Sequence, residues 1–441
     1  MLRMAKSILV VLVVLGGLPR AAVAEKDATP GAVSFQEGDV IGFDQVDRLR
    51  AHVPPELWAN RDYFFYQGMQ LEIGPSHYDY TPPAAYQAAT ERFAGEVRIG
   101  PDGSLENYTA GQPFPVDQID CERDPMAGVK YMWNFQYRWA GAGNAGSFRY
   151  TYWDRGEKLP LYYEGVGRKI PVSHRVEPQY LGENGGNVFK GEKRSFVTGT
   201  DIHAPFDARG IKLLTYRYKS SDGPIGQAKN DDTWVYVPTL RRVRRVSTSQ
   251  RTDAISGTDF TLDDLYSFSG IIPQYEWTCL EESDLLAPGN TRNKAYPVSL
   301  DHDFGPLGLS LASDRWEMRR MVKIRMVPKN DDHPYAYKDF YIDKQTLKPH
   351  YSFAYDQKDE LWKMIWHAKR WSEDKSLTGE WYPSWEGMPR PFDLAVVADL
   401  IINVQTGTGS RIEFWDATGP PFTQKARLRR YIDTGRLTLG R

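Results

Sequence analysis

A period-two alternation of large apolar and mostly polar residues recurs along this chain and limits the folds open to it. Large aromatic residues occupy every second position of the segment 131–139. Such alternation is typical of a β-strand with one buried face. The same period recurs in Ile211–Tyr218, Trp316–Val327, Tyr337–Ile342, Tyr351–Tyr355, Leu361–Trp371 and Ala395–Val404. Short turn sequences separate several of these segments, which favours antiparallel neighbours. The sequence therefore predicts a mainly β fold with one large, curved antiparallel sheet.

Helical signals are few and lie near the N-terminus. Thr81 followed by two prolines predicts the start of a helix, and Pro55–Arg61 predicts one or two further turns. The apolar side of the first helix carries Tyr86, Ala89 and Phe93. We expect these short helices to cover the curved sheet.

Two divisions of the chain fit this pattern. Residues 25–129 form an N-terminal segment whose short helices pack on the sheet, and residues 130–441 form an antiparallel β half-barrel domain. Alternatively, residues 25–441 form one continuous domain, because large all-β domains run long. The stretch Glu281–Asp303 is rich in Gly, Asn, Asp and Pro, which predicts a long surface loop.

The first residues have the pattern of a secretory signal peptide. Arg3 and Lys6 precede the apolar run Ile8–Leu15, and a small-residue cleavage pattern ends at Ala24. We expect cleavage after Ala24 and a periplasmic mature protein. No later segment approaches the ~18 uninterrupted apolar residues of a membrane-spanning helix, so we expect no transmembrane segment in the mature chain.

The net charge bears on possible binding partners, and the cysteine content bears on a possible disulfide. A formal net charge of −2 gives no indication of a nucleic-acid partner. Cys121 and Cys279 are the two cysteines. In an oxidising compartment they either form a disulfide or remain two separate buried thiols, because separation in sequence does not give separation in space.

An aromatic strand followed by arginines stands out in the segment 231–265. Trp234 and Tyr236 point to one side of this strand, and Pro238 ends it. The arginines that follow are Arg241, Arg242, Arg244 and Arg245. Arginine suits both internal ion pairs and anionic ligands, so Arg242 and Arg244 are candidates for an anionic head group.

Acidic residues follow these arginines closely. Thr261 and Asp264 have the spacing of a capping box, which predicts a short helix. Asp259 and Asp263 are available to the arginines. The alternative to ligand binding is therefore an internal ion-pair network that ties two elements together.

Familiar catalytic and cofactor motifs do not fit. Gly141–Gly146 matches the dinucleotide fingerprint, but a strand-like sequence follows it where a helix is required. Gly186–Gly191 resembles a phosphate loop, yet Glu192 replaces the lysine. Neighbouring residues in the triplet 301–303 (Asp-His-Asp) point to opposite faces of an extended chain, which disfavours a shared metal. We expect no cofactor, no metal and no catalytic residues.

Several phrases of the chain resemble the exported proteins of domain-of-unknown-function family 1329. They are DYTPPAAYQAA (79–89), NYTAGQPFP (107–115), DPMAGVKYMWNFQYRW (124–139), YWDRGEKLPLYYEG (152–165), and WVYVPTLRRVRRVS with GTDFTLDDL (234–247 and 257–265). The resemblance implies a fold akin to the periplasmic lipoprotein carriers LolA and LolB, which are incomplete β-barrels closed by helices around an apolar cavity. It also implies partners: an inner-membrane transporter of the resistance-nodulation-division type and an outer-membrane protein.

We therefore expect a periplasmic binding or shuttle protein for a lipid or another hydrophobic small molecule. Its concave side would enclose vacant apolar volume, where each buried methylene contributes about 0.8 kcal/mol. The expected ligand-binding residues are Trp133, Phe135, Tyr137, Trp234, Tyr236, Arg242, Arg244, Trp316 and Met318. For any single strand the alternative is that these side chains pack in an ordinary core.

Two other functions remain open at the level of sequence. One is an accessory subunit that docks on the transporter without carrying cargo. The other is a carbohydrate-active hydrolase, whose paired carboxylates could lie among Glu164, Glu276 and Asp339.

Overall fold

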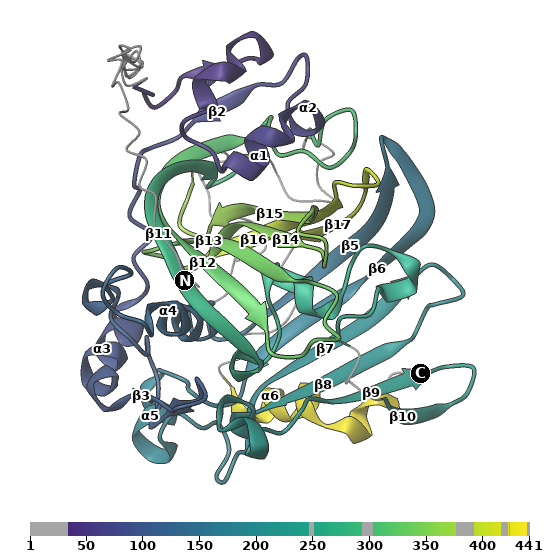
Figure 1. Cartoon of the computed structure of the whole chain (residues 1–441). Coiled ribbons are helices and arrows are strands. Elements are labelled where there is room, and N and C mark those ends of the chain that lie inside the picture. The colour runs from purple at the N-terminus through teal and green to yellow at the C-terminus, as the bar shows by residue number, and fades with distance from the viewer. Residues whose placement is uncertain are drawn as a thin grey trace, which may run out of the picture. The chain divides into compact units, whose positions relative to one another are not determined.

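One large β-sheet organises the unit Phe35–Arg441 in the computed structural model (Figure 1). The structure describes residues 34–246, 251–292, 303–375, 392–415, 422 and 424–438. Within them the sheet has 15 strands. The strands are β1 (Val40–Ile41), β2 (Leu71–Ile73), β5 (Asn144–Asp154), β6 (Glu157–Pro171), β7 (Arg194–Ala204), β8 (Lys212–Tyr218), β9 (Asp232–Val237), β10 (Arg242–Val246), β11 (Tyr275–Pro288), β12 (Arg315–Pro328), β13 (Tyr337–Asp343), β14 (Pro349–Tyr355), β15 (Leu361–Trp371), β16 (Leu394–Asn403) and β17 (Thr408–Trp415).

The strands follow the order β1-β2-β12-β13-β14-β15-β16-β17-β5-β6-β7-β8-β9-β10, and β11 also pairs with β12. The pair β2–β12 is parallel, whereas β11–β12, β12–β13 and the hairpins from β5 to β10 are antiparallel. No described pairing joins β10 to β11, so the sheet is not closed. The predicted mainly β fold with an open, curved sheet is confirmed.

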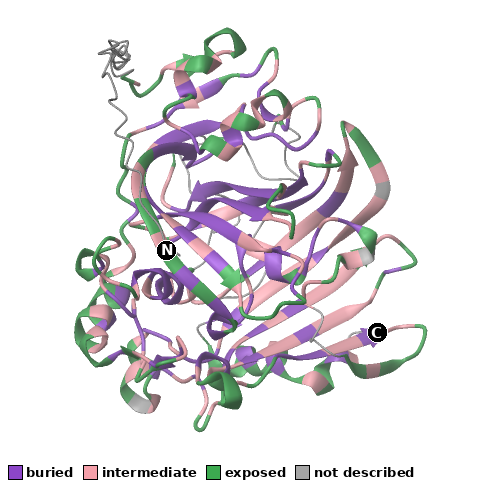
Figure 2. Ribbon diagram, viewed as in Figure 1, coloured by how far each residue is buried: buried purple, intermediate pink, exposed green. Residues whose placement is uncertain are grey.

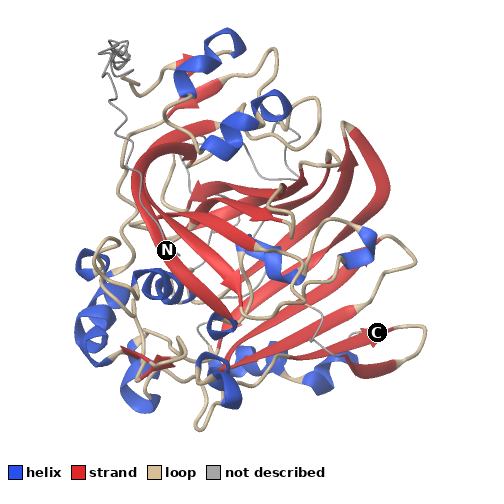
Figure 3. Ribbon diagram, viewed as in Figure 1, coloured by secondary structure: helices blue, strands red, loops and turns tan. Residues whose placement is uncertain are grey.

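Short helices lie around this sheet and over its faces (Figure 3). They are α1 (Pro55–Ala59), α2 (Arg61–Phe64), α3 (Ala84–Phe93), α4 (Ala127–Gln136), α5 (Pro178–Asn184) and α6 (Lys425–Ile432), with 3₁₀ turns that include η1 (Phe43–Leu49), η7 (Leu262–Ser267), η8 (Ile272–Gln274) and η10 (Thr434–Thr438). A second, two-stranded sheet pairs β3 (Arg98–Ile99) with β4 (Leu105–Glu106). Helix α3 begins directly after the two prolines, and α1 lies within Pro55–Arg61, as the sequence predicts.

The outer side of the sheet is buried along most of its width. On β12–β16 it carries Trp316, Tyr351 and Trp366, which pack in a core with side chains of η1, α1 and α2. On β6–β9 it carries other apolar side chains, among them Val197 and Leu214, which pack against α6 and η10. The predominance of buried residues in β12–β16 is visible in Figure 2.

The inner side of β12–β16 is covered as well. Helix α4 packs Met132 and Phe135 against Ile324 and Phe340, and Phe268 from the segment 251–274 joins the same cluster. The concave side of the sheet is therefore filled over these strands. This corrects the expectation that the whole concave side encloses vacant apolar volume.

The strand expected at 131–139 is wrong, because these residues belong mainly to helix α4. The helix buries side chains around almost its whole circumference, including Tyr131, Trp133 and Phe135. Apolar residues at every second position therefore satisfy a fully enclosed helix as well as a strand. Gly128 permits the close packing, because a Cβ there would lie 2.5 Å from the carbonyl oxygen of Trp277 on β11.

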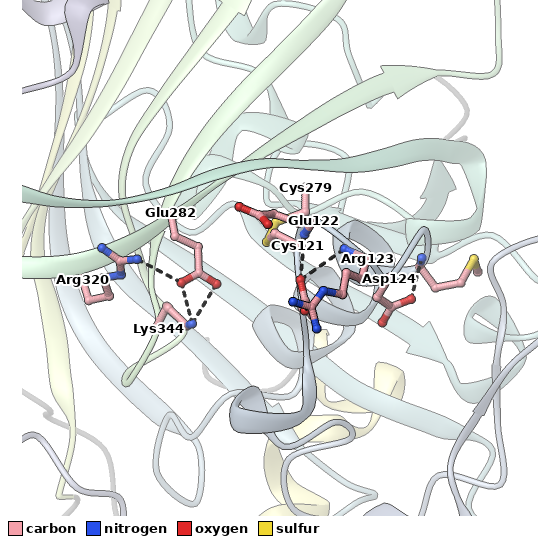
Figure 4. Close-up of a disulfide and its surroundings, with 10 residues drawn as sticks. Cys121, Glu122, Arg123, Asp124, Cys279, Glu282, Arg320 and Lys344 are labelled. Carbon is pink, nitrogen blue, oxygen red and sulfur yellow. Dashed lines mark hydrogen bonds and ion pairs between the residues drawn. A yellow bond between two sulfur atoms is a disulfide. The ribbon is translucent and has the colours of Figure 1, made fainter.

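A disulfide joins Cys121, just before α4, to Cys279 on β11 (Figure 4). Near it, Glu282 on the same strand forms ion pairs with Lys344 at 2.8 Å and Arg320 at 3.4 Å. The covalent link and these ion pairs hold the start of α4 and the turn after β13 beside β11. The predicted loop Glu281–Asp303 is wrong in its first part, because β11 continues to Pro288 through its pairing with β12.

Replacing both cysteines, as Cys121→Ala/Cys279→Ala, is expected to lower the free energy of unfolding by about 2–5 kcal/mol. The two positions are 158 residues apart, so the bridge constrains a long loop of the unfolded chain. Chemical denaturation of the oxidised wild type and the double variant measures the difference. Reductant should shift the wild type and leave the variant unchanged. Equal stability of the two oxidised proteins would contradict a stabilising role.

Candidate functional site

The inner side of β5–β9, here called the inner face, remains partly accessible. Strand pairing determines which side chains belong to the inner face, because directly paired residues of neighbouring strands point to the same side of a sheet. One row is Asn144, Lys169, Thr198, Thr215 and Thr233, and the next is Gly146, Gly167, Thr200, Leu213 and Val235. All of these except Thr233 keep part of their surface accessible. Figure 2 shows the corresponding strands largely in the intermediate class.

Small and weakly polar side chains make up most of this surface. Thr215 and Thr233 satisfy each other through a hydroxyl hydrogen bond of 2.8 Å, which leaves their methyl groups available for apolar contact. Beyond the two rows, Phe148 and Tyr163 lie beside a buried cluster that includes Tyr150. The inner face can therefore support an elongated apolar group without many competing polar atoms.

A small pocket lies at the end of the inner face that is nearest to the C-terminal end of α4. Its volume is about 110 Å³, and its lining combines the chain after α4, the end of β6 and the segment 173–177. Its lining includes Tyr108, Tyr137, Arg138, Lys169, His174 and Phe196. Among the residues expected to bind ligand, Tyr137 lies here. Its hydroxyl donates to Asp222, and its ring lies 4.1 Å from that of Tyr108.

The other aromatic candidates lie in packed cores. Trp133, Phe135 and Trp316 are 0%, 1% and 0% exposed, so their rings have no surface to offer a ligand. Trp234 and Tyr236 share a side of β9, as the alternation predicts, but this is the outer side that packs against α6 and η10. Met318 is partly buried against the core around Trp316.

The arginines of β10 do not form the predicted network with Asp259 and Asp263. Arg242 and Arg244 are exposed on this edge strand, whereas Arg245 contacts Asp232. Asp259 instead accepts hydrogen bonds from Tyr152, Asn403 and Thr408. Asp263 accepts from Arg251 and Tyr275. The predicted pairing with the arginines of β10 is therefore wrong: Asp263 pairs with Arg251 instead, and Asp259 has neutral hydrogen-bond donors.

Asp264 is the centre of the buried network in the segment 251–274. The Thr261 hydroxyl accepts the backbone N–H of Asp264 at 3.2 Å, which is the capping contact that the spacing predicts. Its carboxylate binds Lys338 at 2.7 Å and Lys363 at 3.3 Å and accepts the Tyr335 hydroxyl. Burial alone would raise the pKa of Asp264, but the two lysines hold it well below its usual range.

Asp264→Asn is expected to lower the free energy of unfolding by about 3–5 kcal/mol, because two buried lysines lose their carboxylate. The pKa of Asp264 is depressed in the folded protein, so its contribution is present above the ordinary Asp value of ~3.9 and disappears as the pH falls through the folded value. Denaturation measured at neutral and acidic pH tests both points. Asp331→Asn, at an exposed position, is the matched control.

If the two variants unfold at the same denaturant concentration at neutral pH, Asp264 does not anchor the segment. A deficit for Asp264→Asn that persists unchanged into strong acid would contradict the ionised carboxylate.

Further expectations from the sequence concern the paired carboxylates, the metal-like triplet and membrane-spanning helices. Asp339 is buried and binds Arg325 through two hydrogen bonds of 2.7 and 2.8 Å, so this carboxylate is not free for acid–base chemistry. No cluster of metal-ligating side chains occurs among the residues that the structure describes. Asp301 and His302 of the sequence triplet lie outside the described residues. Within the described ranges, no helix is long and apolar enough to cross a membrane.

Lys169 and Arg138 were not predicted from the sequence. A single lysine in a strand and a single arginine after a helix carry no spacing signal. Their proximity follows from the pairing of β5, β6 and β7 together with the position of α4.

Sequence comparison finds one family over most of the chain. The model of a family described as protein of unknown function (DUF1329) matches residues 57–424. An uncharacterized protein of Pseudomonas aeruginosa is 26% identical over 322 residues, which cover 71% of this chain and 65% of the relative. The match thus spans less than two thirds of that relative's length.

Two solved structures are similar to part of the chain. A DUF1329 family protein of Desulfovibrio piger has 16% sequence identity and a TM-score of 0.43, and the match covers 71% of this chain and 99% of that one. A LolA superfamily protein of Nitrosomonas europaea has 11% identity and a TM-score of 0.35, with 66% and 94% covered.

Proposed function

We propose that this chain, which belongs to the DUF1329 family of proteins of unknown function, binds a lipid-like amphiphile along its inner face and carries it through the periplasm. The observation that carries the proposal is the asymmetry of β5–β9. Part of their outer side, including Val197 and Leu214, is buried under α6 and η10, whereas Thr, Gly, Leu and Val residues of their inner face stay partly accessible. A partly apolar surface left open on a sheet is typical of a binding site.

The energetics favour a ligand with a hydrocarbon tail. Each methylene that leaves water contributes about 0.8 kcal/mol, so a tail of about ten carbons offsets the several kcal/mol that ordering a bound ligand costs. Gly146 and Gly167 add no side chain to the second row. A flexible tail can therefore approach the backbone closely there.

A periplasmic location supports the carrier function. A disulfide such as Cys121–Cys279 is typical of an oxidising compartment, and the pattern of residues 1–24 resembles an export signal. We further propose that the donor and acceptor are an inner-membrane transporter and an outer-membrane protein. This last step rests on the family resemblance alone.

Leu213→Glu is expected to weaken uptake of a fluorescent fatty acid by about tenfold or more, because it places a carboxylate on the apolar part of the inner face. Leu240→Glu, in the exposed turn between β9 and β10, is the matched control and should bind as the wild type does. A fluorescence titration measures the affinities, and melting temperatures verify folding.

Native mass spectrometry of the wild type purified from the periplasm provides the independent test, with a co-purified lipid as the expected result. A clean mass of the protein alone, together with no uptake of the fluorescent fatty acid, would overturn the proposed function.

A further inference from the structure

Two cationic side chains meet in the pocket at the end of the inner face. Lys169 places its Nζ atom 4.5 Å from the ring centroid of Phe196, and no carboxylate binds it among the described residues. Arg138 donates to the carbonyl oxygen of Phe135 and lies 4.2 Å from that ring's centroid. Its Nε atom is buried and has no described hydrogen-bond partner.

The other cations near this pocket already have their own carboxylates. Asp393 acts electrostatically on Arg138, but this carboxylate is engaged elsewhere. The engaged pairs are Lys348 with Asp393 at 2.8 Å, Arg217 with Asp231 at 2.5 Å, and Arg175 with Glu177 at 2.9 Å. Within the described part of the chain, the pocket therefore holds two cations, Lys169 and Arg138, that form no ion pair with a carboxylate.

This excess charge is costly in the empty protein. Lys169 keeps part of its surface accessible, yet protein atoms surround it on most sides, as expected on a concave surface. Burial, and then the positive charge of Arg138, lowers the pKa of Lys169 to about 7. Burial also lowers the pKa of Arg138 to about 10. An anion between the two side chains would remove this cost.

An uncharged imidazole and two tyrosine rings form part of the pocket wall. Burial lowers the pKa of His174 to about 4, so the imidazole is uncharged near neutral pH and its Nδ1–H donates to the carbonyl oxygen of Thr109 at 2.9 Å. The Tyr108 and Tyr137 rings pack on it at 4.8 and 5.0 Å. These side chains shape the pocket without adding negative charge.

We propose that Lys169 and Arg138 bind the anionic head group, a carboxylate or a phosphate, of the amphiphile whose tail lies along the inner face. The inference rests on the proposed function and deepens it. The cavity of about 110 Å³ is well below the ~300–1,000 Å³ of pockets that enclose a whole ligand. It accommodates a head group, and the tail leaves it beside Thr198, the direct strand partner of Lys169.

The test compares ligands that differ only in the head group. A fatty acid, the fatty alcohol of equal length and the corresponding lysophosphatidic acid are titrated into the wild type, Lys169→Met and Arg138→Met. The wild type should prefer both anionic lipids to the alcohol. Each variant should bind the anionic lipids about tenfold more weakly, the loss of one charge-assisted contact, and bind the alcohol with unchanged affinity.

Controls separate recognition from folding. Lys358→Met, at an exposed position of the turn after β14, should leave all affinities unchanged. Lys169→Met removes an unpaired cation, so its melting temperature should equal or exceed that of the wild type. If Lys169 formed a structural ion pair, the same substitution would lower the melting temperature. The stronger of the two anionic lipids identifies whether the natural head group is a carboxylate or a phosphate.

The outcomes distinguish this inference from the proposed function. If the wild type binds acid and alcohol equally and the variants do the same, the carrier function stands and the head-group site is overturned. If no lipid binds, but inorganic phosphate raises the melting temperature of the wild type and of neither variant, the anion site stands and the carrier function fails.

Discussion

The ion pairs of Asp264 with Lys338 and Lys363 determine which part of this sheet remains open. They fasten the segment 251–274 to β13 and β15, and the backbone N–H of Tyr266 extends the attachment to Asp399 on β16. These groups are buried, so the contacts must form together or leave costly unpaired charges. With the segment in place, the inner side of β13–β16 is covered, and accessible surface remains on β5–β9.

The two parts of the sheet, β12–β16 and β5–β9, are therefore packed differently. Over β12–β16 both sides are packed, the outer one by η1, α1 and α2 and the inner one by α4 and the segment 251–274. Over β5–β9 the outer side packs against α6 and η10, whereas the inner side packs at Tyr150 beside Phe260 and elsewhere keeps residues partly accessible. The two largest buried apolar clusters lie over the first part, which allows the second part to leave apolar surface accessible. The proposed carrier function needs both, because a surface that binds a tail cannot also be filled by the protein's own side chains.

The sequence predicted the strands better than it predicted the site. Alternation located β12 to β16 and the shared side of Trp234 and Tyr236, because period-two burial is a local property. It could not tell which side α6 covers, since that helix follows much later in the chain. The alternation pattern failed at α4. The aromatic residues of this helix are enclosed on all sides, so their spacing did not indicate which side of the segment is buried. Lys169 and Arg138 become a site only through the register of several strands and the end of a helix.

The error at α4 also explains how the pocket is built. A strand through 131–139 would have continued the sheet, whereas the helix ends at Gln136 and turns Tyr137 and Arg138 toward the end of β6. The disulfide at Cys121 fixes the other end of this segment to β11. The backbone of Arg138 is thus anchored next to a packed helix and that of Lys169 in a paired strand, so neither cation can move far toward a carboxylate. In the proposed head-group site this repulsion would persist until an anion enters, so the pocket would select for charge while the inner face would accept tails of varied length.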